Sequence, residues 1–344
     1  MSTTFKTLLS DDVVSTRTLL HESIPITGSI ISGTYADSNI KNFSHGRFQS
    51  VYDYPYLSSS ANHIFDITVG YSARSALSSS NSIENSKKLQ IYNQMAQTLV
   101  GHDINGNILD FDQDGDILAG GAKIKEAFFF NFSRLLSKDE IKKGTLSLLV
   151  GDSIYAAQQT TSKSLTDYGS SNEYRVNSPS GEYGLIYTSS INITNTAPVG
   201  IVYYQAGIVV LTASLFAGTA GHFNYTNGVL FGVDATLTAS TIQSTCDALR
   251  RRMCNLSFNN TVELNSTIYF CRANHNEFNY SANPTYLSGS KVRVKNTTVD
   301  NPVSYITTVG LYSADSELLA VAKVSEPLKK DPTNELILRV RLDY

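Results

Sequence analysis

The residues best suited to chemistry are the aspartates of one short acidic segment, which reads DFDQDGDI. This segment matches the D-x-D-x-D-G start of a calcium-binding loop, with an apolar residue at the eighth position. The matching residues are Asp110, Asp112, Asp114, Gly115 and Ile117. Ca²⁺ binds six to eight oxygen atoms, and carboxylates at alternate positions of a tight loop supply them. The sequence therefore offers a calcium hypothesis with the first three aspartates as ligands.

Two features of the same segment count against calcium. The twelfth position of such a loop carries a bidentate Glu, but here it is Gly121, and no pair of flanking helices is evident. The alternative is a pair of acidic turns, NG at 105–106 and DG at 114–115, each at the end of a β-hairpin. Both interpretations stay open, and calcium is the single cofactor that we consider.

No motif in the chain predicts a catalytic centre. The six histidines show no HExxH spacing, and no GxSxG, phosphate-binding or dinucleotide-binding glycine pattern occurs in the expected context. The acidic segment could supply paired carboxylates to a glycosidase, but carboxylates crowded in one loop rarely span a scissile bond. We therefore predict that the chain is not an enzyme and has no catalytic residues, with a cell-wall hydrolase as the enzymatic alternative.

An aromatic segment near the N-terminus, NFSHGRFQSVYDYPY, is the first candidate for protein contact. Pro55 keeps the preceding Tyr54 out of the α region, so the end of this segment is not helical. As a loop, it would present Tyr52, Tyr54 and Tyr56 to a partner. The alternative is an aromatic plug over the protein's own core.

The elements expected around these residues are mainly strands. At the C-terminal end, three strands and two turns are predicted over 305–344, with Glu326 and Pro327 ending the second strand because proline cannot donate to a ladder. In the third strand Leu336, Leu338, Val340 and Leu342 alternate with Ile337, Arg339, Arg341 and Asp343, which indicates a half-buried strand. Helices are predicted over 87–100, with Ser86 as the N-cap, and over 240–254.

The fold class that follows is mainly β, with β-sandwich-like sheets, two or three α-helices and two lobes. The strands between 184 and 234 are nearly continuous in apolar residues, so both of their faces should be buried by a second sheet or by another chain. We predict an N-terminal mixed lobe over 1–150, a central β region over 151–235 and a C-terminal helix plus β domain over 236–344.

Composition limits the class of partner. Charged residues make up 17% of the 344 residues, against about 25% in ordinary globular proteins, and the chain has 20 Tyr and no Trp. Surfaces rich in tyrosine and poor in charge often lie against partners. The net charge of −3 does not favour nucleic acid or an anionic membrane. Three cysteines without a CxxC spacing are typical of a reducing cytoplasm, and no apolar run predicts a transmembrane helix or a signal peptide.

Four blocks of sequence resemble phage proteins. The segment YITTVGLYSADSELLAVAK resembles the baseplate-attachment domains of tailed-phage fibre proteins, and its GLY and LAVA runs carry the likeness. Three further blocks resemble virion structural proteins of contractile-tail, T-even-like phages, including cyanophages. They read FFFNFSRLLSKDEIKKGTLSL, VGIVYYQAGIVVLT and YFCRANHNEFNYSANPTY.

The resemblance implies a structural protein of a phage virion, most readily a component of the tail baseplate. Its partners would be other tail proteins in a homo- or hetero-oligomeric assembly, and it would be synthesised in the host cytoplasm and located in the virion. It would make protein–protein contacts, with Tyr312 among the contact residues, and it could anchor a tail fibre. The alternatives are a receptor- or glycan-binding module at the tail tip and a protein of the neck or head–tail connector.

Overall fold

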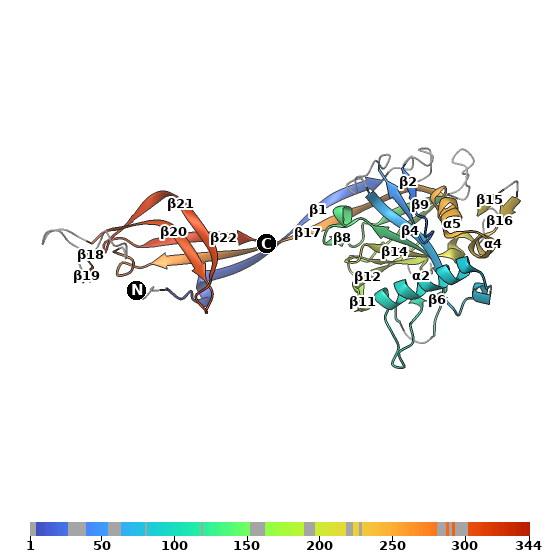
Figure 1. Ribbon diagram of the computed structural model, residues 1–344, viewed down its shortest axis with the longest axis horizontal. Helices are drawn as coiled ribbons and strands as arrows, with labels where there is room; N and C mark the ends of the chain where they lie inside the picture. Colours follow the sequence, from blue (N-terminus) through green and yellow to red (C-terminus); the bar gives the residue numbers. More distant parts are fainter. Residues whose placement is uncertain are drawn as a thin grey trace. The chain divides into compact units, whose positions relative to one another are not determined.

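The computed structural model of the chain confirms a mainly β fold, with 48% of residues in strands and 18% in helices (Figure 1). It describes residues 5–26, 39–53, 63–79, 81–117, 120–151, 162–188, 197–217, 223–226, 229–280, 287–288, 291–292 and 302–344. Within these residues there are four α-helices where two or three were expected: α2 (Ile83–Leu99), α3 (Arg134–Ser137), α4 (Val233–Ala239) and α5 (Ile242–Arg250).

The chain divides into two compact units. The terminal unit consists of Met1–Leu19 and Glu263–Tyr344, and the central unit is the continuous segment Leu20–Val262. The boundaries expected at 150 and 235 both fall inside the central unit. They do so because strands on either side of them pair: β14 (Ile208–Thr212) with β7 (Glu126–Phe132) across 150, and the start of β17 (Met253–Ala273) with β9 (Ser147–Gly151) across 235.

The central unit contains two antiparallel sheets. The order of the larger sheet is β11 (Arg175–Ser178), β12 (Gly181–Ile186), β13 (Gly200–Tyr203), β14, β7, β4 (His63–Tyr71), β3 (Gln49–Tyr52) and β2 (Ile40–Asn42). The smaller sheet contains β10 (Ser162–Thr166), β9 (Ser147–Gly151), β8 (Glu140–Ile141) and the first part of β17 (Met253–Ala273). The strand β1 (Val13–Ile26) pairs with β17, and both cross the boundary between the units. Two short hairpins complete the unit: β5 (Phe111–Asp112) with β6 (Lys123–Ile124), and β15 (Asn224–Thr226) with β16 (Val229–Phe231).

The three consecutive phenylalanines of β7 show how both faces of the larger sheet are buried. Successive side chains of a strand point to opposite faces. Phe130 lies toward the smaller sheet, where it lines a small apolar cavity of about 10 Å³ together with Leu148 and Leu256. Phe129 lies toward α2, with its ring centroid 6.3 Å from that of Tyr92. The expected burial by a second sheet is therefore observed, and α2 covers the opposite face.

The helix α2 packs very closely on β4. A Cβ atom at Gly70 would lie 2.6 Å from the carbonyl oxygen of Lys88, so a glycine is required there. The helix begins at Ile83, earlier than expected, because Ser82 and not Ser86 accepts the backbone N–H of Asn85. From this helix the buried Lys88 donates to the carbonyl oxygens of Leu237 and Ser240, at 2.5 and 2.6 Å, and so binds the C-terminal end of α4.

The terminal unit has the three expected C-terminal strands. They are β20 (Ser304–Tyr312), β21 (Leu318–Lys330) and β22 (Leu336–Asp343), and the short strands β18 (Leu287–Ser288) and β19 (Lys291–Val292) form a separate pair. β22 pairs with the last part of β17, and β20 pairs with β21 alone. The prediction that Pro327 ends the second strand was wrong. Its missing N–H costs nothing there, because the register between β20 and β21 shifts at this point and leaves Pro327 without a partner.

The two units differ in how much apolar surface they bury. The hydrophobic core consists entirely of central-unit residues, from Ile26 to Phe258. Among the described residues of the terminal unit, the buried apolar side chains are those of Ala273 and Val340. All three cysteines of the chain are free thiols. Among the described residues, no helix combines the length and the apolar composition needed to span a bilayer.

Candidate functional site

The acidic segment forms the loop of the β5–β6 hairpin in the central unit. Phe111 of β5 is fully buried, and its ring lies 5.4 Å from that of Tyr92 and 5.6 Å from that of Phe129. The hydroxyl of Tyr92 donates to the carbonyl oxygen of Ile124 in β6, at 2.5 Å, and accepts the N–H of Phe111, at 3.2 Å. The start of the loop is therefore fixed to α2 and to the core. The DG turn at 114–115 lies in the loop of a β-hairpin, as the alternative interpretation expected.

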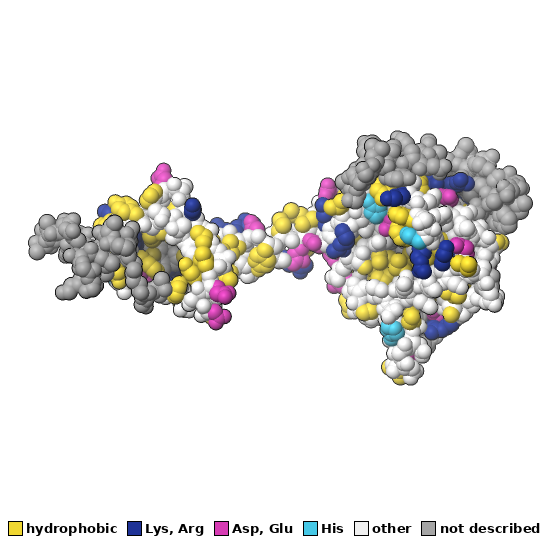
Figure 2. All heavy atoms as spheres, viewed as in Figure 1, with side chains coloured by type: hydrophobic (Ala, Val, Ile, Leu, Met, Phe, Trp, Pro, Cys, Tyr) yellow, Lys and Arg dark blue, Asp and Glu magenta, His cyan; other side chains and the backbone are white. Residues whose placement is uncertain are grey.

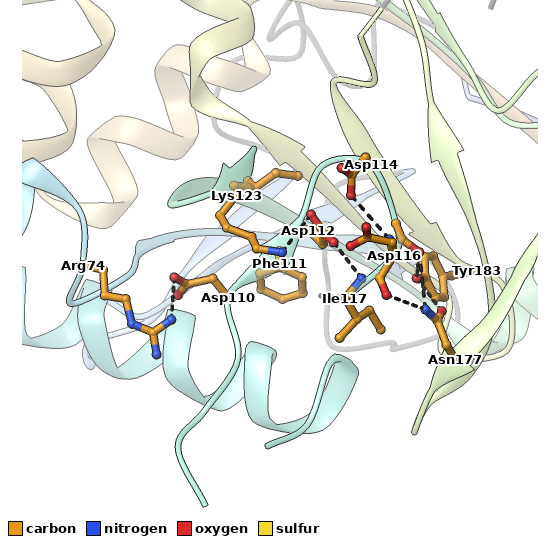
Figure 3. A network of polar contacts seen from close by, with 12 residues as sticks. Arg74, Asp110, Phe111, Asp112, Asp114, Asp116, Ile117, Lys123, Asn177 and Tyr183 are labelled. Atoms are coloured by element: carbon orange, nitrogen blue, oxygen red, sulfur yellow. Dashed lines mark hydrogen bonds and ion pairs between the residues drawn. The ribbon is translucent and has the colours of Figure 1, made fainter. Parts of the chain in front are cut away.

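Asp110 does not join the other two aspartates of the calcium hypothesis. Its carboxylate accepts the hydroxyl of Ser72 at 2.6 Å and forms an ion pair with Nη1 of Arg74 at 2.8 Å. Figure 3 shows it directed toward Arg74, away from the remaining aspartates. Because its two oxygen atoms have these partners, Asp110 connects two segments of the chain and contributes nothing to a cluster with Asp112.

The carboxylates that the fold brings together are those of Asp112, Asp114 and Asp116. One oxygen atom from each of the three carboxylates lies within 4.8 Å of the other two, with Asp112 buried and the other two residues exposed. Asp116 was not among the expected ligands. The alternation of aspartates in the sequence cannot show which three converge, because that depends on where β5 ends and the turn begins.

Asp112 has a structural role that is independent of any ion. Its Oδ2 accepts the N–H of Ile117 at 2.7 Å, and its Oδ1 lies 3.1 Å from Nζ of Lys123 (Figure 3). Ile117 has a φ of 61°, which is rare for a β-branched residue, so the hydrogen bond holds a strained turn. Burial raises the pKa of the Asp112 carboxyl, and the carboxyl groups of Asp116 and Asp114 raise it further, whereas Lys123 and the Ile117 N–H lower it.

The outer part of the loop is held by the larger sheet. The hydroxyl of Tyr183 in β12 donates to the carbonyl oxygen of Gly115 at 2.8 Å. The side-chain amide of Asn177 in β11 donates to the carbonyl oxygen of Asp116 at 3.2 Å. The carbonyl oxygens of Gly115 and Asp116, which are potential ligands of a cation, therefore accept hydrogen bonds within the protein.

This arrangement fits calcium only in part. With one oxygen atom from each, the three carboxylates offer half or fewer of the six to eight that Ca²⁺ requires, and Gly121 brings no side-chain oxygen. The Lys123 ammonium already supplies positive charge next to Asp112. Calcium binding stays a prediction, with the candidate ligands now Asp112, Asp114 and Asp116.

Of the three tyrosines expected near the N-terminus, the structure describes one. Tyr52 is the last residue of β3 and is half-buried, and its backbone exchanges hydrogen bonds with Asn39. Its ring lies 5.4 Å from that of His63 in β4. Tyr54 and Tyr56 lie outside the described residues, so a contact surface built from all three tyrosines stays a prediction.

Tyr312 lies on an exposed apolar surface of the terminal unit, which we call the Tyr312 face. Cross-strand partners point to the same side of a hairpin. Gly310 pairs with Val321, Tyr312 with Leu318 and Thr308 with Lys323, so these six residues form one face of β20–β21. All six are exposed, and Figure 2 shows apolar side chains on the surface of this hairpin.

The opposite face of the same hairpin is half-buried along its length. It carries Val309, Leu311, Ala320, Ala322 and Val324. The Tyr312 face is therefore the outward one, yet it exposes three large apolar side chains, those of Tyr312, Leu318 and Val321. The relative exposures of Tyr312, Leu318 and Val321 are 46%, 53% and 55%. The sequence pattern showed two apolar faces but not which of them the protein itself covers.

Comparison with known proteins returns no match: no family model, no curated protein and no solved structure is similar to this chain.

Proposed function

We propose that this chain is a structural component of a phage virion, located in the tail baseplate, where it acts by making protein–protein contacts. The observation that carries the proposal is the open construction of the terminal unit. Its strands expose large apolar side chains, and its described residues bury only Ala273 and Val340 among their apolar ones. A folded unit of about 100 residues ordinarily buries more than half of the surface of its chain. Contiguous exposed apolar surface marks an interaction site.

The position of the resemblance supports the same conclusion. The residues that carry the likeness to fibre attachment domains, GLY at 310–312 and LAVA at 319–322, lie in β20 and β21. They form the hairpin that exposes the Tyr312 face. The part of the chain that resembles an attachment domain is thus the part whose apolar surface is uncovered. This coincidence favours the β20–β21 hairpin as the part of the chain that makes a contact in the assembly.

The experiment that tests the proposal is imaging of phage particles with gold-labelled antibodies against the chain. We expect label at the distal end of the tail on intact particles and on detached tails. Label at the head–tail junction would move the protein to the neck and would contradict the baseplate location. If no particle is labelled by an antibody that binds the purified chain, the virion proposal is refuted.

A further inference from the structure

We propose that the Tyr312 face is covered by the same face of a second copy of this chain, packed against it about a two-fold axis. This inference rests on the proposed function, because it names the first partner of an assembly protein. Among the described residues, Phe5 contacts Tyr312 on this face and leaves it about half exposed. Four observations favour a second copy of this chain as the partner of the Tyr312 face.

The first observation is that apolar side chains fill the centre of the face. A Cβ atom at Gly310 would lie 2.9 Å from Cε2 of Tyr312 and 3.2 Å from Cδ1 of Leu318, so these side chains lie across the glycine. Val321 stands opposite Gly310 in the ladder. Tyr312, Leu318 and Val321 thus form one exposed apolar group, which an identical group on a second copy can cover.

The second observation is an aromatic contact at the edge of the face. The ring of Phe5 lies 4.8 Å from that of Tyr312, and both side chains remain about half exposed, at 47% and 46%. Aromatic side chains contribute strongly to interfaces when they become fully desolvated. The N-terminal segment therefore enlarges the apolar area without closing it off from a partner.

The third observation is the placement of charge at the two ends of the face. The turn that joins the strands carries Asp315 and Glu317, and Lys323 lies at the opposite end. All three side chains are exposed, and within the part of the chain that the structure describes none of them has an ion-pair partner. A two-fold axis that lies in the plane of the face and runs across the strands places the acidic end of each copy over the basic end of the other. The pattern is thus complementary to itself.

The fourth observation concerns the charge of the whole terminal unit. It contains eleven Lys and Arg residues and eleven Asp and Glu residues, so its formal net charge is zero. Two copies can approach through this unit without long-range repulsion. A strongly acidic or basic partner would gain nothing from the unit as a whole. The charge pattern therefore favours a second copy over a partner of opposite charge.

The first test measures the mass of the full chain in solution over a range of concentrations by analytical ultracentrifugation. We expect a monomer–dimer equilibrium. The double variant Leu318→Asp, Val321→Asp should weaken it by at least about 100-fold, because each substitution occurs twice in a two-fold interface. The matched control is Ile83→Asp, which places Asp at an 80% exposed apolar position at the start of α2. A wild-type chain that stays monomeric, or a control that dissociates equally, would overturn the proposal.

The second test uses charge reversal and distinguishes a second copy from every other occupant. Lys323→Glu makes both ends of the face acidic, and Asp315→Lys with Glu317→Lys makes both ends basic. Each variant alone should dimerise about tenfold more weakly than the wild type, and the two mixed together should form a heterodimer. If the mixture remains as weakly associated as the separate variants, the two-fold pairing is wrong.

These outcomes separate the inference from the proposed function. A chain that is monomeric in solution but labels the tail end of particles would refute the second-copy inference and leave the virion role standing. If the chain dimerises through the Tyr312 face but the antibody labels no particle, the second-copy inference is supported and the virion role is refuted. Circular dichroism of each variant shows whether its fold is intact, because the substituted side chains are exposed and their loss should leave the spectrum unchanged.

Discussion

The two units of this chain differ in how far they bury their apolar side chains. The central unit packs two sheets and a helix around a closely packed core. The phenylalanine side chains of β7 point to both faces of the larger sheet. The terminal unit is built from strands that are as apolar but leaves much of their surface in contact with water. Equal apolar content thus gives a self-sufficient unit in one case and a unit open to a partner in the other. What differs is the layer that covers the strands.

The largest expected difference between the units is the cost of removing one aromatic side chain. Phe130→Ala should lower the free energy of unfolding of the central unit by about 3–5 kcal/mol, because it leaves a cavity between two sheets. Tyr312→Ala should change stability by less than about 0.5 kcal/mol in the dilute monomer, because the side chain is exposed. Urea denaturation followed by circular dichroism measures both. A comparable loss from the two substitutions would break the contrast between the units.

A second prediction concerns the buried charge of the central unit. Burial lowers the pKa of Lys88 from 10.5 to about 8, although Glu84 and Cys246 act in the opposite direction. Between these two pH values the unfolded chain binds more protons than the folded one, so this residue makes stability rise with pH. Relative to Lys88→Met, the wild type should gain about 2 kcal/mol between pH 7 and pH 9.5.

The Lys88→Met variant is the internal reference in that measurement, because tyrosines and Cys246 also titrate at high pH in the unfolded chain. Urea denaturation at each pH gives the free energy of unfolding of both proteins. A difference between them that is constant from pH 7 to pH 9.5 would show that Lys88 is not desolvated in the folded protein. The terminal unit should contribute nothing to the difference.

The smallest expected effect is that of calcium on the acidic loop. With three carboxylates and a neighbouring lysine, binding in the millimolar range is the most that the site supports, and about 1 mM Ca²⁺ should raise the melting temperature by about 1–3 °C. Mg²⁺ serves as the control ion. Asp114→Asn should remove the effect, whereas Asp110→Asn should leave it, because Asp110 binds Arg74 instead. An equal shift in both variants would exclude the loop as its source.

The parts of the fold that local patterns determine could be predicted from the sequence. The alternation of β22 is observed as expected, with Val340 buried and Ile337 exposed. The helix expected over 87–100 is also observed, within α2, and Tyr92, Ala96 and Leu99 lie on its buried side. Both predictions rest on periodicity, which the strand and the helix impose on any chain that has one face toward a core.

The parts that depend on distant pairing could not be predicted in this way. Ser15 of β1 forms a hydrogen bond with Thr267 of β17, 252 residues away, and no local pattern announces that contact. The unit boundaries were missed for this reason. The acidic site was predicted in part, because Asp112 and Asp114 converge as expected. Asp110 was misassigned because the sequence does not show that Arg74 and Ser72 lie beside it.

The long separation between β1 and its partner strand has a consequence for the order of folding during synthesis. At a translation rate of about 5–20 residues per second, roughly 10–50 s pass between the synthesis of Ser15 and that of Thr267. During that interval nearly all of the central unit is synthesised, and its earlier strands and α2 can begin to fold before Thr267 is available. The Tyr312 face is made only afterwards. The surface with the greatest tendency to associate is therefore synthesised later than the central unit, which can fold before that surface is exposed.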